Sequence, residues 1–327
     1  MIYVKISRFY IKSSIMAIVF PNTLRSSADN MHWLASLTNH RDVVHSSNPI
    51  ILDLSNVREF DENLCAALGV LISHWKHSGR SVMLDTRAEV EILAGFKRNG
   101  FLSEVHLPRS WYDLLALFSP DRSIDADRAN NQVECIPYKR FNRLDTNAQA
   151  EYVENLINSH WWPEMSVGVK GALADCILEV FNNAQEHSES ETGVFVCGHI
   201  GKAGQRSMKV TIADAGIGFR RKIENALDKK MQSGQAIAWG MKEGNTVRQG
   251  NPGGLGLTIL KEFIRKNDGR LIVVSDRGSW ELSSDKGERH MEHNTSFPGT
   301  LVTIIVNTED PKAYRLVGEA THQREGD

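Results

Sequence analysis

The chain has 327 residues, which is long enough for two domains of ordinary size. Its formal net charge of -2 excludes a strong general attraction to nucleic acid or to acidic membranes. Hydrophobic residues make up 41% of the chain, but no apolar run reaches the length of a membrane span, so we expect a soluble cytoplasmic protein without nucleic-acid or membrane partners. The cysteines form no CxxC pair and are expected to be reduced thiols: Cys65, Cys135, Cys176 and Cys197.

The first part of the chain alternates short apolar runs with helical patterns. One or two strands are expected over 2–11 and 16–20, and further strands over 49–54 and 82–84. Helices are expected over 23–46, 64–75 and 87–98, with Gly79 and Gly100 ending the last two. This order of strands and helices predicts a small α/β domain with a mixed or parallel sheet.

Residues 48–107 resemble a STAS domain, the fold of the anti-anti-sigma factors. The similar segments are Ile50-Ile51-Leu52-Asp53-Leu54, Phe60-Asp61, Leu68-Gly69-Val70-Leu71 and Val82-Met83-Leu84. In the phosphorylatable members a serine follows the aspartate, whereas here Asp61 is followed by Glu62, Asn63 and Leu64. The resemblance therefore implies a domain that docks or senses a protein partner, and the missing hydroxyl argues against phosphate acceptance in this loop.

A polar stretch over 119–135 has few apolar residues and is expected to be a linker or exposed loop. The predicted domains are 1–120 (STAS-like), a linker at 121–135, a second domain at 136–312 and a tail at 313–327. In the second domain we expect helices over 145–158, 166–187 and 258–266, and strands over 193–198, 208–213, 270–275 and 299–306.

The helix over 166–187 carries the first candidate site residues. Its apolar side chains recur at i, i+3 and i+4, so one side of the helix is buried. Glu179 and Asn183 are four residues apart and share the other side, with His187 one turn further on. A carboxylate can accept a proton from an attacking hydroxyl, and a carboxamide oxygen suits Mg²⁺. The alternative is a surface helix that carries these polar groups by chance.

Two glycine motifs follow. The expected strand over 208–213 runs into Asp214, Gly216 and Gly218, where glycines allow close approach of a flat ligand and the carboxylate can accept a hydrogen bond from an exocyclic amine. The alternative is an ordinary turn at a strand end. Further on, the loop 250–257 is rich in glycine and leads into a helix, which suits phosphate binding, although it matches neither the Rossmann nor the P-loop template.

Taken in order, these motifs resemble the GHKL ATP-binding family, which includes sensor histidine kinases, anti-sigma serine kinases, mismatch-repair ATPases, type II topoisomerases and heat-shock chaperones. The resemblance covers about residues 140–308. It implies an α/β sandwich with helices on one face of a mixed sheet, and ATP with Mg²⁺ as the ligands.

The resemblance also implies a role for each site residue. Asn183 would bind Mg²⁺, Glu179 would be the general base, and His187 occupies a position where kinase branches often have histidine. Asp214 would bind the adenine amine, with Thr300 nearby. The remaining positions would shape the nucleotide pocket: Gly216 and Gly218 under the adenine, and Gly253, Gly254, Leu255, Gly256 and Leu257 at the phosphates.

The stretch between Phe219 and Gly250 occupies the place of the mobile ATP lid of this family. It carries the basic residues Lys229, Lys230, Lys242 and Arg248. The alternative is a solvated helix–loop segment without special use.

Three functions follow from this reading. The first is a signalling switch, an ATPase or serine/threonine-type kinase coupled to a STAS-like partner-binding domain. The second is an ATPase whose lid closure drives homodimerisation or a conformational cycle. The third is a module that senses ATP or ADP without turnover.

Overall fold

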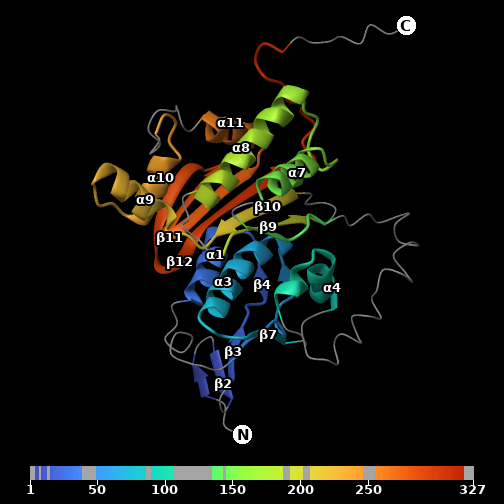
Figure 1. Ribbon diagram of the computed structural model, residues 1–327. Helices are drawn as coiled ribbons and strands as arrows, with labels where there is room; N and C mark the ends of the chain where they lie inside the picture. Colours follow the sequence, from blue (N-terminus) through green and yellow to red (C-terminus); the bar gives the residue numbers. More distant parts are fainter. Residues whose placement is uncertain are drawn as a thin grey trace, which may run out of the picture.

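The computed structural model contains two five-stranded sheets, one from each half of the chain (Figure 1). The structure describes residues 4–6, 9–12, 15–38, 49–85, 90–105, 135–142, 145–186, 192–201, 207–245 and 255–319. His187, Gly253, Gly254 and Arg248 therefore lie outside the described residues. Within the described part of the chain, no helix is long and apolar enough to cross a membrane.

The N-terminal sheet is mixed, which is one of the two alternatives that the sequence left open. Its strand order is β1-β2-β3-β5-β7, with β1 to β3 antiparallel and β3, β5 and β7 parallel. The strands are β1 (Val4–Ile6), β2 (Phe9–Lys12), β3 (Ile15–Val19), β5 (Ile50–Asp53) and β7 (Val82–Asp85). Residues 2–11, expected as one extended segment, contribute to two strands, β1 and β2.

The helices of this half are α1 (Ala28–Ser36), η1 (Glu62–Leu64), α3 (Cys65–His77), α4 (Val90–Arg98) and η2 (Phe101–Glu104). The helices expected over 64–75 and 87–98 are confirmed as α3 and α4, whereas the short η1 and η2 were not predicted. The prediction that a helix begins at residue 23 was wrong, because β4 (Thr23–Leu24) pairs with β6 (Glu59–Phe60). The helix begins only after Ser27, whose hydroxyl accepts a hydrogen bond from the backbone N–H of Asn30.

The C-terminal sheet is antiparallel in every pairing that the structure describes. Its strand order is β11-β12-β10-β9-β8. The strands are β8 (Lys139–Phe141), β9 (Val194–Ile200), β10 (Ser207–Asp214), β11 (Arg270–Ser283) and β12 (Gly287–Asn307). The expectation of a mixed sheet was wrong, since β9–β10 and β11–β12 are consecutive strands with short connections, and such connections join antiparallel neighbours.

The longer helices of this half cover one face of this sheet, and the shorter ones lie at its edge (Figure 1). The covering helices are α7 (Thr146–Ile157), α8 (Val167–Glu186) and α11 (Leu255–Lys266); the shorter ones are α9 (Gly218–Leu227) and α10 (Ser233–Gly240). Alternate residues of β10, Met208, Val210 and Ile212, belong to the apolar core on this helical face. The predicted helix 166–187 is therefore confirmed as α8.

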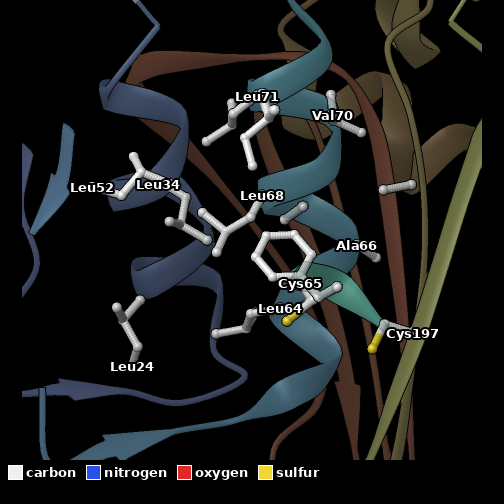
Figure 2. Close-up of a cluster of buried hydrophobic side chains, with 14 of the residues drawn as sticks. Leu24, Leu34, Leu52, Leu64, Cys65, Ala66, Leu68, Val70, Leu71 and Cys197 are labelled. Atoms are coloured by element: carbon white, nitrogen blue, oxygen red, sulfur yellow. The ribbon is translucent and has the colours of Figure 1, made fainter. Parts of the chain in front are cut away.

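The opposite face of the C-terminal sheet is covered by the N-terminal half of the same chain. Helices α1 and α3 pack against β9 to β12, below the sheet in the view of Figure 1. Figure 2 shows Cys65 of α3 beside Cys197 of β9, and the Asn99 amide donates to both sulfurs, at 3.7 and 3.6 Å. Leu68 of α3 belongs to the same buried cluster as Phe195 of β9. The two halves thus share one apolar core, while the predicted domain boundaries remain a prediction because residues 106–134 lie outside the described residues.

Strands β11 and β12 are much longer than predicted. The prediction ended the first strand at residue 275 and began the second at 299, but both continue into a hairpin that turns at 284–286. Helix α1 packs on this extension, where the His32 and His293 rings stack with centroids 3.4 Å apart. Burial lowers the pKa of His32 to about 4, with a contribution from His293, so the His32 imidazole is neutral at pH 7.

Candidate functional site

Helix α8 carries Glu179 and Asn183 at the border between its buried apolar side and its exposed side. Its apolar stripe is buried against the sheet and against α7 and α11: Leu173, Cys176, Ile177, Val180, Phe181 and Ala184. Glu179 and Asn183 are half-buried, as expected for positions at the border of that stripe. Packing therefore fixes the helix while both polar groups keep access to a ligand.

Asp214 is the last residue of β10 and is only 4% exposed. Because side chains alternate along a strand, the Asp214 side chain lies on the same face as that of Ile212, which is the face that the helices cover. Its Oδ1 accepts a hydrogen bond from the N–H of Gly216 at 2.7 Å. Burial raises the pKa of Asp214 to about 7, although hydrogen bonds from the backbone of Gly216 and Thr300 partly offset this. A buried carboxyl with so perturbed a pKa is a candidate for ligand contact.

A tight turn follows Asp214 and is held by a serine that the sequence reading missed. Ser275 of β11 accepts a hydrogen bond from the N–H of Phe219 at 3.0 Å and donates to the carbonyl of Gly299 at 2.9 Å. Gly218 has φ +76°, and a Cβ there would lie 2.6 Å from Ser275 Oγ. Only glycine fits this position, as the sequence motif implied.

Thr300 lies directly opposite Asp214 in the pairing of β12 with β10. Its Oγ1 is 3.2 Å from Ser275 Oγ. The preceding Gly299 has φ +125° and passes so close to β10 that a Cβ would lie 2.0 Å from the Asp214 carbonyl oxygen. The structure thus brings Asp214, Gly218 and Thr300 together, although Thr300 is far away in the sequence.

The glycine-rich loop is described only from its end onwards. Helix α11 begins at Leu255, three residues earlier than predicted, and the side chains of residues 255 and 256 are not described. Leu257 is half-buried and packs on the helical-side core. The loop leads into α11, and α11 packs along α8, the helix that carries Glu179 and Asn183. The described end of the loop therefore lies next to α8.

The stretch predicted as a lid contains two packed helices, α9 and α10. The Asp276 carboxylate, at a bulge of β11, ties both to the sheet: it accepts from Arg220 Nε at 2.6 Å and from Ser233 Oγ at 3.0 Å. Ile237 of α10 is fully buried. Lys229, Lys230 and Lys242 are exposed. The lid prediction stays a prediction, since residues 246–254 lie outside the described residues.

A comparison with protein families identifies this region. Residues 168–309 match the family of histidine kinase-, DNA gyrase B- and HSP90-like ATPases. They form an ATPase-type domain of this family. The match runs from the start of α8 to the end of β12 and includes every predicted site residue, which confirms the GHKL resemblance for the C-terminal half. It does not include residues 1–167, and a search of curated proteins found no match.

The donor set of this ATPase domain suits magnesium that arrives with a nucleotide. Among the described residues, no cluster of three or more His, Cys, Asp and Glu side chains could hold a metal ion alone. Mg²⁺ in nucleotide sites needs only one or two protein oxygens, because phosphates and water supply the others. The half-buried carboxamide of Asn183 fits this requirement.

Proposed function

We propose that the ATPase domain binds Mg-ATP on the helical face of its sheet and promotes attack on the γ-phosphate. The observation that carries this proposal is the buried Asp214, which ends β10 on the face covered by α8, within the matched family region. Asp214 would accept a hydrogen bond from the adenine amine beside Gly216 and Gly218. The phosphates would then extend toward α8 and the start of α11.

Glu179 is the proposed general base. A carboxylate one helical turn before a magnesium ligand can take the proton from a hydroxyl or water that attacks phosphorus. Asn183 would hold Mg²⁺, which when bound neutralises charge on the phosphate oxygens. The backbone N–H groups at the start of α11 would point toward the same phosphates.

The acceptor of the phosphoryl group is proposed to be water or a separate protein. The loop at Asp61, where the STAS resemblance would place a phosphate acceptor, carries no hydroxyl and packs against Lys209 on the far face of the sheet. A transfer within the chain to this loop would have to cross the sheet. We propose that the N-terminal half is a STAS-like regulatory unit of the ATPase domain.

Replacing Glu179 with Gln is expected to lower phosphate release by at least about 100-fold, since general-base catalysis contributes roughly 10²–10⁴-fold. The affinity for Mg-ATP should stay within about twofold, because glutamine keeps the size and the polarity of the side chain. Phosphate release and calorimetric titration measure the two quantities. Glu151→Gln, on the exposed side of α7, is the control and should leave both unchanged. A wild-type protein that binds Mg-ATP without releasing or transferring phosphate would instead indicate a nucleotide sensor.

Replacing Asn183 with Ala is expected to remove the magnesium dependence of ATP binding. The affinity in Mg²⁺ should fall at least roughly tenfold, to the value measured with a chelator, because the metal loses its protein oxygen. Titrations with and without Mg²⁺ check this. Asn182→Ala changes the neighbouring asparagine of α8 and should retain the magnesium effect. Equal magnesium effects in wild type and Asn183→Ala would remove Asn183 from the site.

A further inference from the structure

Strand β10 contacts both halves of the chain: the side chains on one of its faces pack under α8, and those on the other face contact the N-terminal half. Met208, Val210 and Ile212 point into the core under α8. The residues between them point the other way, where Lys209 and Thr211 contact the N-terminal half. Since β10 ends at Asp214, the strand that holds the N-terminal half also positions the nucleotide-site carboxylate.

A buried carboxylate anchors the N-terminal half on this strand. Asp61 is 7% exposed and accepts hydrogen bonds from Lys209 Nζ at 2.7 Å and from the Ser26 N–H at 2.6 Å. His199 of β9 places its Nε2 3.7 Å from the other carboxylate oxygen. Burial raises the pKa of Asp61, but Lys209, His199 and Ser26 more than offset this and hold it below the ordinary value. The carboxylate is therefore ionised, and breaking the contact would leave a buried charge without its partner.

A second contact of the same loop continues along this face of the sheet, from β10 to the neighbouring strand β12. Asn63 is fully buried; its Nδ2 donates to Thr211 Oγ1 at 2.7 Å, and its Oδ1 accepts from Ser26 Oγ at 2.9 Å. Thr211 in turn hydrogen-bonds Thr303 of β12 at 2.7 Å. Thr303 lies three residues after Thr300, on the strand that faces Asp214. A continuous set of hydrogen bonds thus joins the N-terminal loop to both strands that carry the site.

The strand ends at the site leave little room for displacement. The backbone of Gly299 lies against the Asp214 carbonyl so closely that no side-chain carbon fits between them. A shift of β10 relative to β12 must therefore move Asp214 relative to Thr300. Close-packed interiors transmit such shifts because they do not deform gradually.

We propose that docking of the Asp61–Asn63 loop on Lys209 and Thr211 holds β10 in the position that binds nucleotide, so that the N-terminal half regulates the affinity of the ATPase domain. This inference rests on the proposed ATP site. The N-terminal half then acts from the far face of the sheet as a positioning unit, and any partner that pulls this loop away from β10 weakens nucleotide binding.

The test uses the full chain with the substitution Asp61→Asn. We expect Mg-ATP affinity to fall by about 5- to 50-fold, within the range of allosteric couplings, while Asp214 and the turn after it are unchanged in sequence. Glu62→Gln is the matched control: it alters the next residue of the loop, whose carboxylate pairs at 3.0 Å with Arg98 inside the N-terminal half. Its affinity should stay within about twofold of wild type. Thr211→Val, which keeps the side-chain shape, provides a milder variant if Asp61→Asn does not fold.

If the loop and the nucleotide site are coupled, nucleotide binding must also affect the loop. A loop with a purely structural role would not respond in this way. Because coupling acts in both directions, Mg-ATP should slow amide hydrogen exchange in η1 and the first turn of α3 in the wild type, and less so in Asp61→Asn or Thr211→Val. Unchanged or tighter nucleotide binding in a folded variant, or no effect of Mg-ATP on exchange in these segments, would overturn the inference. A wild-type protein that fails to bind Mg-ATP at all would instead remove the proposed function, and this inference with it.

Discussion

Replacing Asp214 with Asn is expected to weaken Mg-ATP binding by about 100-fold or more. The carboxamide oxygen can still accept from the N–H of Gly216, but the amide NH₂ would then face the backbone N–H of Thr300 and the adenine amine. Two donors that face each other in a buried site lose a hydrogen bond and leave groups unpaired, which costs about 1–3 kcal/mol for each group. Calorimetric titration at pH 8 measures the affinity.

The same substitution should remove a pH-dependent loss of stability from the free protein. Burial raises the pKa of Asp214 to about 7, so the folded state favours the protonated carboxyl. The stability that this group contributes is therefore present below its unfolded pKa near 4 and is lost as the pH rises to 7, by up to ~4 kcal/mol. Asp214→Asn removes this loss, since asparagine does not ionise.

The measurement is urea unfolding of both proteins at pH 5 and pH 8. The free energy of unfolding of the variant should rise relative to that of wild type from pH 5 to pH 8, on top of the pH-independent cost of the unpaired Thr300 N–H. Asp285→Asn, in the exposed turn of the β11–β12 hairpin, is the control and should not alter the pH profile in this way. If Asp214→Asn bound Mg-ATP as tightly as wild type, the adenine contact would have to be assigned to another group.

The parts of the site that were predictable are those with a local signal. Helix α8 follows from a strong apolar repeat, and its two polar residues follow from a spacing of four. The turn after Asp214 needs glycine because Gly218 has a positive φ, which is visible in the sequence as a glycine motif. Local chemistry of this kind depends on neighbours along the chain only.

Contacts between distant strands had no such signal. Ser275 looks like the polar end of an apolar strand, yet it holds the turn at Phe219, 56 residues away. The extension of β12 over 287–296 is polar and mostly exposed, so it shows no apolar alternation. The extension of β11 buries Trp280 and Leu282, but this apolar pair is too short to predict a strand. The mixed C-terminal sheet was implied by the GHKL resemblance and not by any pattern in the sequence, and every described pairing of that sheet is antiparallel.

The packing of the two halves against each other could not be predicted, because charged residues form part of the contact. Asp61 and Lys209 are 148 residues apart, and charged residues are almost always assigned to the surface. The STAS resemblance directed attention to the missing hydroxyl after Asp61, while the loop in fact supplies buried polar contacts to the ATPase domain. Its charge and amide are satisfied only in the presence of both halves.

Replacing Gly299 with Ala is expected to destabilise the protein by about 2–6 kcal/mol. Gly299 has φ +125°, a conformation that costs a residue with a side chain about 1–3 kcal/mol. The added Cβ would also lie 2.0 Å from the Asp214 carbonyl oxygen, a backbone atom that can yield only if β10 moves, and such overpacking costs a further 1–3 kcal/mol or so. Thermal and urea unfolding measure the loss.

Gly287→Ala separates backbone strain from the clash. Gly287 also has a positive φ, +63°, but a Cβ there meets nothing within 4 Å, so only about 1 kcal/mol should be lost. Because the clash at Gly299 acts on the residue proposed to bind adenine, Gly299→Ala should also weaken Mg-ATP binding at a temperature where it is still folded, and Gly287→Ala should not. Equal losses of stability in the two variants, or a Gly299→Ala protein with wild-type affinity, would contradict the tight approach of β12 to the end of β10.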